Sequence, residues 1–153
     1  AQFIGSPTMN FLPARIGKDG CVELLGQRLP IRTGLEANAP ASIGIRPESI
    51  APTGPSGVRD GQAGLNAVLR RKENLGSEYI LHFDVAGLGS STVTSRVPSD
   101  RFNPDSGAFS ELAFDVAACH VFDGNGDRVE PLDAQGRTND APIRLFLTKG
   151  AAG

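Results

Sequence analysis

Glycine and proline interrupt this chain so often that a fold built from long helices is excluded. The 153 residues include 19 Gly and 11 Pro, and both residues are unfavourable inside a helix. The segments between them are short, and their apolar residues alternate with polar ones. Residues 78–85 place four apolar side chains on one strand face, namely Tyr79, Leu81, Phe83 and Val85. The pattern predicts an all-β fold of short strands joined by tight turns.

Turn residues set the limits of the predicted strands. Gly17-Lys18-Asp19-Gly20 is typical of a hairpin turn in which both glycines take positive φ. Pro13 argues against a central position for the first strand, because proline cannot donate to a sheet. The predicted strands are Met9–Ile16, Cys21–Leu25, Gln27–Ile31, Ala41–Ile45, Leu65–Lys72, Glu78–Val85, Ser91–Val97, Ser110–Asp115 and His120–Asp123, with a turn leading on to Arg128 and Val129. About nine or ten strands at this spacing favour a barrel, most simply an OB-like β-barrel.

A loop rich in Pro, Gly and Ser at Ala51–Gly64 is predicted to divide the strands into two sets. Residues 1–132 then form one OB-like domain, with a first strand set in 1–50 and a second in 65–132. Residues 133–153 are expected to be a tail, with one candidate edge strand at Ile143–Leu147 before a disordered end.

Ten apolar positions are predicted to fill the core, because they lie on the inward face of these strands. They are Phe11, Ile43, Ile45, Leu69, Leu81, Phe83, Val97, Leu112, Phe114 and Phe122.

The charge balance argues against a nucleic-acid partner. Fifteen basic and seventeen acidic residues give a net charge of −2, whereas a phosphate backbone requires a strongly basic face. Arg70-Arg71-Lys72 is either a solvated strand end or an anion patch. No run of 18 apolar residues and no signal peptide is recognisable, so we expect a cytoplasmic protein.

No catalytic, cofactor or metal site is predicted from the sequence. There is no Gly-x-x-x-x-Gly-Lys-Ser/Thr loop for a nucleotide's phosphates. His82 is interpreted as a structural imidazole. Cys119 and His120 are adjacent in a strand, and adjacent strand residues point to opposite faces, so they are not expected to form a nucleophile–base pair. We expect Cys21 and Cys119 to be free thiols.

Asp123-Gly124-Asn125-Gly126-Asp127 has the alternating oxygen donors of a calcium loop. The twelve-residue calcium pattern, however, requires Gly at its sixth position and Glu at its twelfth. Arg128 and Ala134 stand at those positions. The segment is therefore interpreted as a β-turn.

Four blocks of sequence, in order, resemble a known family. They are FIGSPTMNF at 3–11, GIRPESI at 44–50, ENLGSE at 73–78 and HVFD at 120–123. Together they resemble the C-terminal regulatory region, the TOBE domain, of the ATP-binding subunits of maltose and glycerol-3-phosphate type ABC importers. The resemblance covers residues 3–130, and its first block marks the junction with the ATPase domain.

The resemblance implies an OB-like regulatory and dimerisation domain that follows an ATPase domain in a longer subunit. ATP and Mg²⁺ would be bound by that ATPase domain, and no cofactor is expected in this chain. The implied partners are a second copy of the subunit, membrane permease subunits and, in some members, a regulatory protein. The implied location is the cytoplasmic face of the bacterial plasma membrane, reached through the permease.

Six residues are proposed from these blocks as an exposed regulatory contact face. They are Arg46, Pro47 and Glu48 at one corner, where Arg46 and Glu48 are expected to interact, and Gly76, Ser77 and Glu78 in a later turn. The alternative interpretation of Arg46–Glu48 is a scaffold corner.

An alternative function is a stand-alone TOBE-type sensor of small oxyanions, since related barrels bind molybdate. Such a site requires backbone N–H groups together with Ser, Thr or Lys. Gly87–Ser91 is the candidate segment, although it is more typical of a hairpin loop than of an anion site. An enzyme is disfavoured for want of a catalytic constellation.

Overall fold

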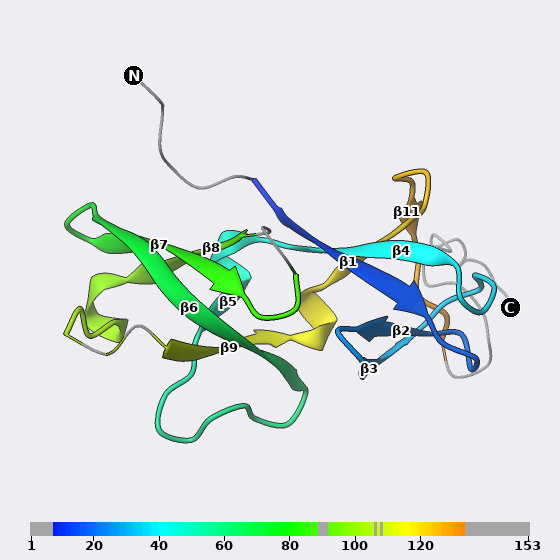
Figure 1. Cartoon of the computed structure of the whole chain (residues 1–153), viewed down its shortest axis with the longest axis horizontal. Coiled ribbons are helices and arrows are strands. Elements are labelled where there is room, and N and C mark those ends of the chain that lie inside the picture. The colour runs from blue at the N-terminus through cyan, green and yellow to red at the C-terminus, as the bar shows by residue number, and fades with distance from the viewer. Residues whose placement is uncertain (1–7, 89–91, 106, 108, 134–153) are drawn as a thin grey trace, which may run out of the picture.

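The computed structural model describes residues 8–88, 92–105, 107 and 109–133, and this part of the chain is all-β (Figure 1). It holds eleven strands in two sheets and three single-turn 3₁₀ helices. The predicted fold class is confirmed. The predicted edge strand at Ile143–Leu147 lies outside the described residues.

The first sheet has six antiparallel strands in the order β11-β10-β4-β1-β2-β3. Their bounds are Arg128–Val129, His120–Asp123, Pro40–Ile45, Asn10–Ile16, Cys21–Leu24 and Gln27–Arg32. After β11 the chain reaches the opposite edge of the same sheet, where the Leu132 N–H donates to the Arg32 carbonyl at 2.9 Å. This bond nearly closes the sheet into a barrel.

The second sheet has five antiparallel strands in the order β5-β9-β6-β7-β8. Their bounds are Ile50–Pro52, Phe109–Asp115, Gln62–Asn74, Glu78–Val85 and Thr92–Pro98. The Ser95 hydroxyl of β8 donates to the Ile50 carbonyl of β5, so the two edge strands of this sheet also meet. Each sheet thus curves back on itself, as expected for a barrel-like fold.

The two sheets do not follow the predicted strand sets. Ile50–Pro52 belongs to the second sheet, whereas His120–Asp123 and Arg128–Val129 return to the first. The return occurs because β10 pairs with β4, with Val121 opposite Ile43. The predicted loop at Ala51–Gly64 is also shorter, because β5 ends at Pro52 and β6 begins at Gln62.

The tight turns of the first sheet form where they were predicted. In the Gly17–Gly20 turn, Gly17 N–H donates to the Cys21 carbonyl at 2.8 Å. Only Gly20 has a positive φ, of 82°, so the expectation for Gly17 was wrong. β1 is nevertheless central in this sheet, between β4 and β2, so the expectation from Pro13 was wrong. The proline is tolerated because β2 pairs with β1 only at Arg15 and Ile16, beyond Pro13.

One apolar core runs through both sheets. Its largest fully buried side chains include Phe83, Phe114, Leu12, Ile43 and Leu112. Seven of the ten predicted core residues are buried, namely Ile43, Ile45, Leu81, Phe83, Val97, Leu112 and Phe114. Leu69 and Phe122 are only partly buried. Phe11 is 57% exposed, so the prediction that it is a core residue was wrong.

The Asn10 side chain joins the two sheets. Its amide is 5% exposed and donates to the Ile45 carbonyl of β4 at 3.1 Å and to the Thr94 carbonyl of β8 at 2.9 Å. Its oxygen accepts the Thr94 N–H at 2.8 Å. Asn10 therefore pairs with backbone groups of both sheets at their junction, which lies at the start of β1 and the end of β4 (Figure 1).

We expect Asn10→Ala to lower the free energy of unfolding by about 2–4 kcal/mol, because it leaves buried backbone donors and acceptors unpaired. Urea denaturation measures the change. Asn66→Ala, at an exposed position of β6, is the matched control and should change stability by less than about 0.5 kcal/mol. Equal effects of the two substitutions would contradict the assigned role of Asn10.

Candidate regulatory surface

The predicted corner at residues 46–48 is a single 3₁₀ turn, Pro47–Ser49, that joins β4 to β5. Arg46 is extended (φ −67°, ψ 148°), as expected for a residue before proline, and its carbonyl accepts the Ser49 N–H at 2.9 Å. Pro47 is buried, whereas Arg46 and Glu48 are exposed. The buried proline fixes the corner and leaves two opposite charges at the surface.

Arg46 contacts His120 instead of the expected Glu48. Its guanidinium lies 2.9 Å from His120 Nε2. Partial burial lowers the pKa of His120, and the charges of Arg128 and Arg46 lower it further, against a smaller raising effect of Glu130. The neutral imidazole can then accept a hydrogen bond from Arg46. The expected Arg46–Glu48 interaction was wrong, because β10 pairs with β4 and places His120 opposite Gly44.

The second predicted segment is the turn between β6 and β7. Gly76 has a φ of 89°, and its N–H donates to the Asn74 side chain at 2.9 Å. Gly76 and Ser77 are exposed. Glu78 forms an ion pair of 3.0 Å with Arg96 of β8. The described contacts tie this turn to Arg96 and Ser99, and within the described residues none joins it directly to the 46–48 corner.

Sequence reasoning missed the exposed face of the first sheet. Phe11 and Phe122 stack edge to face with ring centroids 5.4 Å apart. Both flank Gly44, because Phe11 is opposite Gly44 in the sheet register and a Cβ added to Gly44 would lie 2.9 Å from the Phe122 ring and would also collide with the Met9 sulfur. The signal was present in the alternation, since Asn10 and Leu12 are buried and Phe11 must therefore face outward.

The candidate reactive groups Cys119 and His82 are both partly buried. Partial burial, aided by the charge of Asp115, raises the pKa of the Cys119 thiol to about 12. Both cysteines are free, as expected. His82 lies between Glu73 at 2.7 Å and the Thr94 hydroxyl at 3.3 Å. No group of three or more metal-ligating side chains occurs among the residues that the structure describes.

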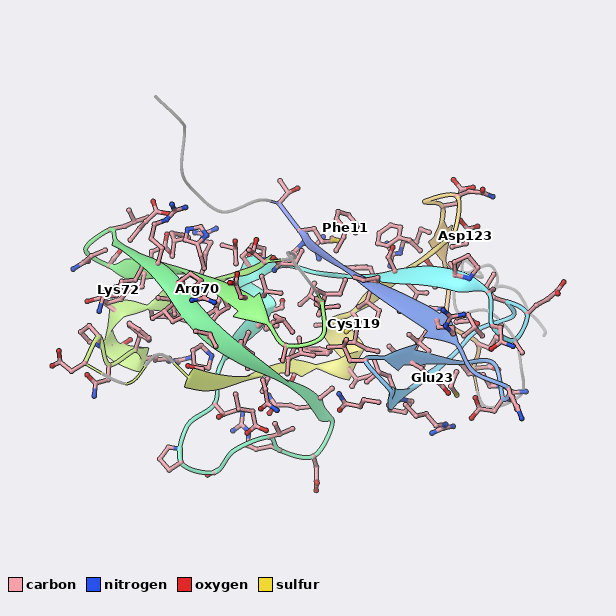
Figure 2. The ribbon with its side chains drawn as sticks, viewed as in Figure 1. Phe11, Glu23, Arg70, Lys72, Cys119 and Asp123 are labelled. Atoms are coloured by element: carbon pink, nitrogen blue, oxygen red, sulfur yellow. The ribbon has the colours of Figure 1, made fainter. Side chains whose placement is uncertain are left out.

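The structure supports a β-turn at Asp123 and a solvated strand end at the basic run Arg70-Arg71-Lys72. The Asp123 carboxylate accepts the N–H groups of Asn125 and Asp127 at 2.9 and 3.0 Å, and the segment is a β-turn. Arg70 pairs with Asp84, and Lys72 donates to the Pro104 carbonyl. Figure 2 shows Arg70 and Lys72 on β6, away from Phe11 and Asp123.

Two protein-family models match this chain. The "TOBE domain" model matches residues 43–122, and the "MalK OB fold domain" model matches residues 5–50. The chain belongs to the TOBE domain family. The second model also agrees with the OB-like architecture predicted for this TOBE domain.

Curated relatives of this TOBE domain are ATP-binding proteins of importers. The chain is 33% identical to the sn-glycerol-3-phosphate import ATP-binding protein UgpC of Chromohalobacter salexigens, over 84% of the chain and 34% of that protein. It is 36% identical to the trehalose/maltose import ATP-binding protein MalK of Thermococcus litoralis, over 80% of the chain and 34% of that protein. The chain spans about a third of the length of these relatives.

A solved structure has a similar fold. The cytoplasmic molybdate-binding protein ModG superposes with a TM-score of 0.55 at 14% identity, over 78% of this chain and 98% of that one. At this identity the likeness concerns the fold alone. In the described part of the TOBE domain, no helix is long and apolar enough to cross a membrane.

The lowered pKa of His120 predicts a pH dependence of stability. The His120 imidazole binds a proton more tightly in the unfolded chain than in the folded one. The contribution of the neutral imidazole to folding stability is therefore present above the ordinary histidine pKa of about 6.5 and is lost as the pH falls through the folded pKa. His120→Gln keeps an acceptor for Arg46 but does not titrate. Urea denaturation between about pH 7.5 and 5.5 should show a shallower loss of stability for His120→Gln than for the wild type. Parallel curves would contradict the assignment.

Proposed function

We propose that this chain is the regulatory domain of the ATP-binding subunit of an ABC importer for sugars or sugar-like solutes. One observation carries the proposal. The MalK OB fold and TOBE models match in succession along the chain. The named relatives are import ATP-binding proteins that align with most of the chain over 34% of their own length. The domain would follow the ATPase domain in the same subunit.

In this proposal the chain provides contact surfaces, and the ATPase domain of the full-length subunit carries out the chemical reaction. ATP and Mg²⁺ would bind in the ATPase domain, and this chain would hold no cofactor. Its partners would be a second copy of the subunit, permease subunits reached through the ATPase domain and, in some systems, a regulatory protein. The subunit would lie at the cytoplasmic face of the membrane, held there by the permease.

Of the six residues expected on an exposed face, Pro47 is buried and Glu78 is half-buried in an ion pair with Arg96, so the proposed contact residues are reduced to the other four. Arg46, Glu48, Gly76 and Ser77 are exposed, which a contact face requires. The turn that holds Arg46 and Glu48 lies directly after β4, whose Ile45 carbonyl accepts a bond from Asn10. The joined sheets would let the domain transmit a contact at this corner as one body.

The coding sequence upstream of Ala1 provides the first test of the proposal. We expect a Walker A loop and an ABC signature within about 240 residues upstream of Ala1, which is one motor domain's length. A start codon directly before Ala1 would contradict the proposal.

Nucleotide binding provides a biochemical test. We expect the product of the complete gene to bind a fluorescent ATP analogue, and the 153-residue chain to give no saturable signal. Saturable binding by the 153-residue chain would contradict the division of roles.

The alternative function is a stand-alone sensor of small oxyanions. Of its candidate segment Gly87–Ser91, residues 89–91 lie outside the described part of the chain. A different feature supports this alternative, since a hollow of about 280 Å³ beside the 53–61 loop is lined by Thr53, Ser56, Arg59 and Gln62. The Thr53 and Ser56 hydroxyls and the Arg59 guanidinium are donors that suit an oxyanion, whereas the Gln62 amide already donates to Asp115.

Calorimetry separates the two functions. Molybdate, tungstate, sulfate and phosphate should give no binding heat with the 153-residue chain if it is a regulatory domain alone. Binding heat that is lost in Arg59→Ala would favour the sensor.

A further inference from the structure

An apolar groove lies where the two sheets meet, between the edge strand β3 and the 3₁₀ turn η3 (Val116–Ala118) that follows β9. It is a hollow of about 480 Å³. The apolar side chains that line it include Ile31, Val116, Cys119, Pro131 and Leu132. Figure 2 shows Cys119 near the middle of the molecule, where the end of β9 approaches β2 and β3. A hollow of this volume with a mostly apolar lining is typical of a binding pocket.

The described part of the chain covers this apolar lining only in part. Val116 and Cys119 pack against the core, yet they remain partly exposed, as does Leu132. Among the described residues that line the groove, only Arg32 is charged. Because an ion or a polar molecule loses water contacts here and finds few polar partners, the groove suits apolar side chains better.

The outer edge of β3 forms one wall of the groove and is only partly paired. β3 is the last strand of the first sheet, and its Arg32 carbonyl accepts the Leu132 N–H at 2.9 Å. In the part of the chain that the structure describes, no strand pairs along the rest of this edge. An open edge favours the addition of an extended segment. Pro30 has no N–H and limits the backbone bonds that such a segment can make, so side-chain packing must supply most of the contact.

The chain itself forms part of this groove and continues beyond it. Pro131 and Leu132 lie in its wall, and residues 134–153 follow them in the sequence. The main apolar stretch of these residues is Ile143–Leu147, the edge strand predicted from the sequence. Residues 134–142 connect it to Asp133 and can span roughly 30 Å when extended. The stretch can therefore return to the groove that its own chain helps to form.

The stretch has the alternation that a one-sided contact requires. Ile143, Leu145 and Leu147 are separated by Arg144 and Phe146. In an extended conformation the first three side chains share one face, and Arg144 and Phe146 share the other. One face is therefore wholly aliphatic and matches the lining of the groove.

We propose that Ile143–Leu147 docks in this groove in an extended conformation, with Leu145 against Val116 and Cys119. Because the segment is tethered, its effective concentration at the groove is on the order of millimolar, and a weak apolar contact is enough to hold it. The docked segment covers the apolar lining and the open edge of β3. This contact goes beyond the proposed function and does not rest on it, since both sides of the contact belong to this chain.

Alkylation of Cys119 by iodoacetamide tests the contact from the side of the groove. Docking shields the thiol in the complete 153-residue chain. We expect Leu145→Asp to speed the reaction by roughly fivefold or more, because an aspartate is costly to bury in an apolar groove and releases the segment. Phe146→Asp adds the same charge on the opposite face and should leave the rate unchanged. Burial and the charge of Asp115 raise the pKa of this thiol to about 12, so all rates are compared at about pH 9.

Cys21 provides an internal control for this measurement. Its side chain is buried, and it does not line the groove. Peptide mass spectrometry resolves the two cysteines, so both rates come from the same sample. Cys21 should react equally slowly in the wild type and in both variants, which separates release of the segment from unfolding of the barrel.

Limited trypsin digestion tests the contact from the side of the segment, in the unaltered chain. The bond after Arg144 lies inside the docked segment, and the bond after Arg137 lies outside it. A synthetic peptide of residues 134–153 gives the intrinsic ratio of the two cleavage rates. Relative to that ratio, we expect cleavage after Arg144 in the 153-residue chain to be slowed by roughly tenfold or more, because the protease cuts only the released segment.

Three results would overturn the proposal. They are equal Cys119 rates in the wild type and in Leu145→Asp, a trypsin ratio equal to that of the free peptide, and protection that disappears on dilution, which would place the segment of a second copy in the groove. None of these results bears on whether the upstream coding sequence encodes an ATPase domain, so failure of this contact and failure of the proposed function are distinguishable.

Discussion

The carboxamide of Asn10 is the interaction on which the arrangement of the two sheets depends. Apolar burial brings the sheets together but has no direction, and it would tolerate several ways of stacking them. The buried Asn10 amide must pair both its N–H bonds and its oxygen with backbone groups of Ile45 and Thr94. Only one arrangement of the two sheets makes all of these bonds. Any slip between the sheets leaves polar groups unpaired away from water, which is costly. The junction is therefore specific as well as stable.

The inward orientation of the Asn10 side chain determines which neighbouring side chain of β1 faces the solvent. Successive strand residues point to opposite faces, so an Asn10 that faces the junction turns Phe11 to the outside. β4 then presents Gly44 beside that ring, and β10 adds Phe122 and His120 on the same face. The buried contact of Asn10 is thus coupled to the exposure of the Phe11 ring, which stacks on Phe122.

Neighbouring strands, and not neighbouring residues, decide the chemistry of the corner. Arg46 and Glu48 are two residues apart, yet Arg46 contacts His120, which is 74 residues away. Pro47, between Arg46 and Glu48, is buried and holds the backbone of the corner. The pairing of β10 with β4 brings the His120 imidazole to Arg46. Partial burial and the charges of Arg128 and Arg46 lower the pKa of His120, which favours the neutral imidazole that accepts a hydrogen bond from Arg46.

The sequence by itself determined the strands and turns, because alternation, glycine and proline act over a few residues. The β7 segment at 78–85, the corner at Pro47 and the turn at Asp123 all follow from such local rules, and the family blocks pointed to the TOBE domain. The tertiary structure decided which sheet each strand joins, since residues 120–129 return to the first sheet through pairing with β4. It also decided the exposure of Phe11 and the partner of Arg46. These depend on contacts between residues far apart in the chain, which no local pattern encodes.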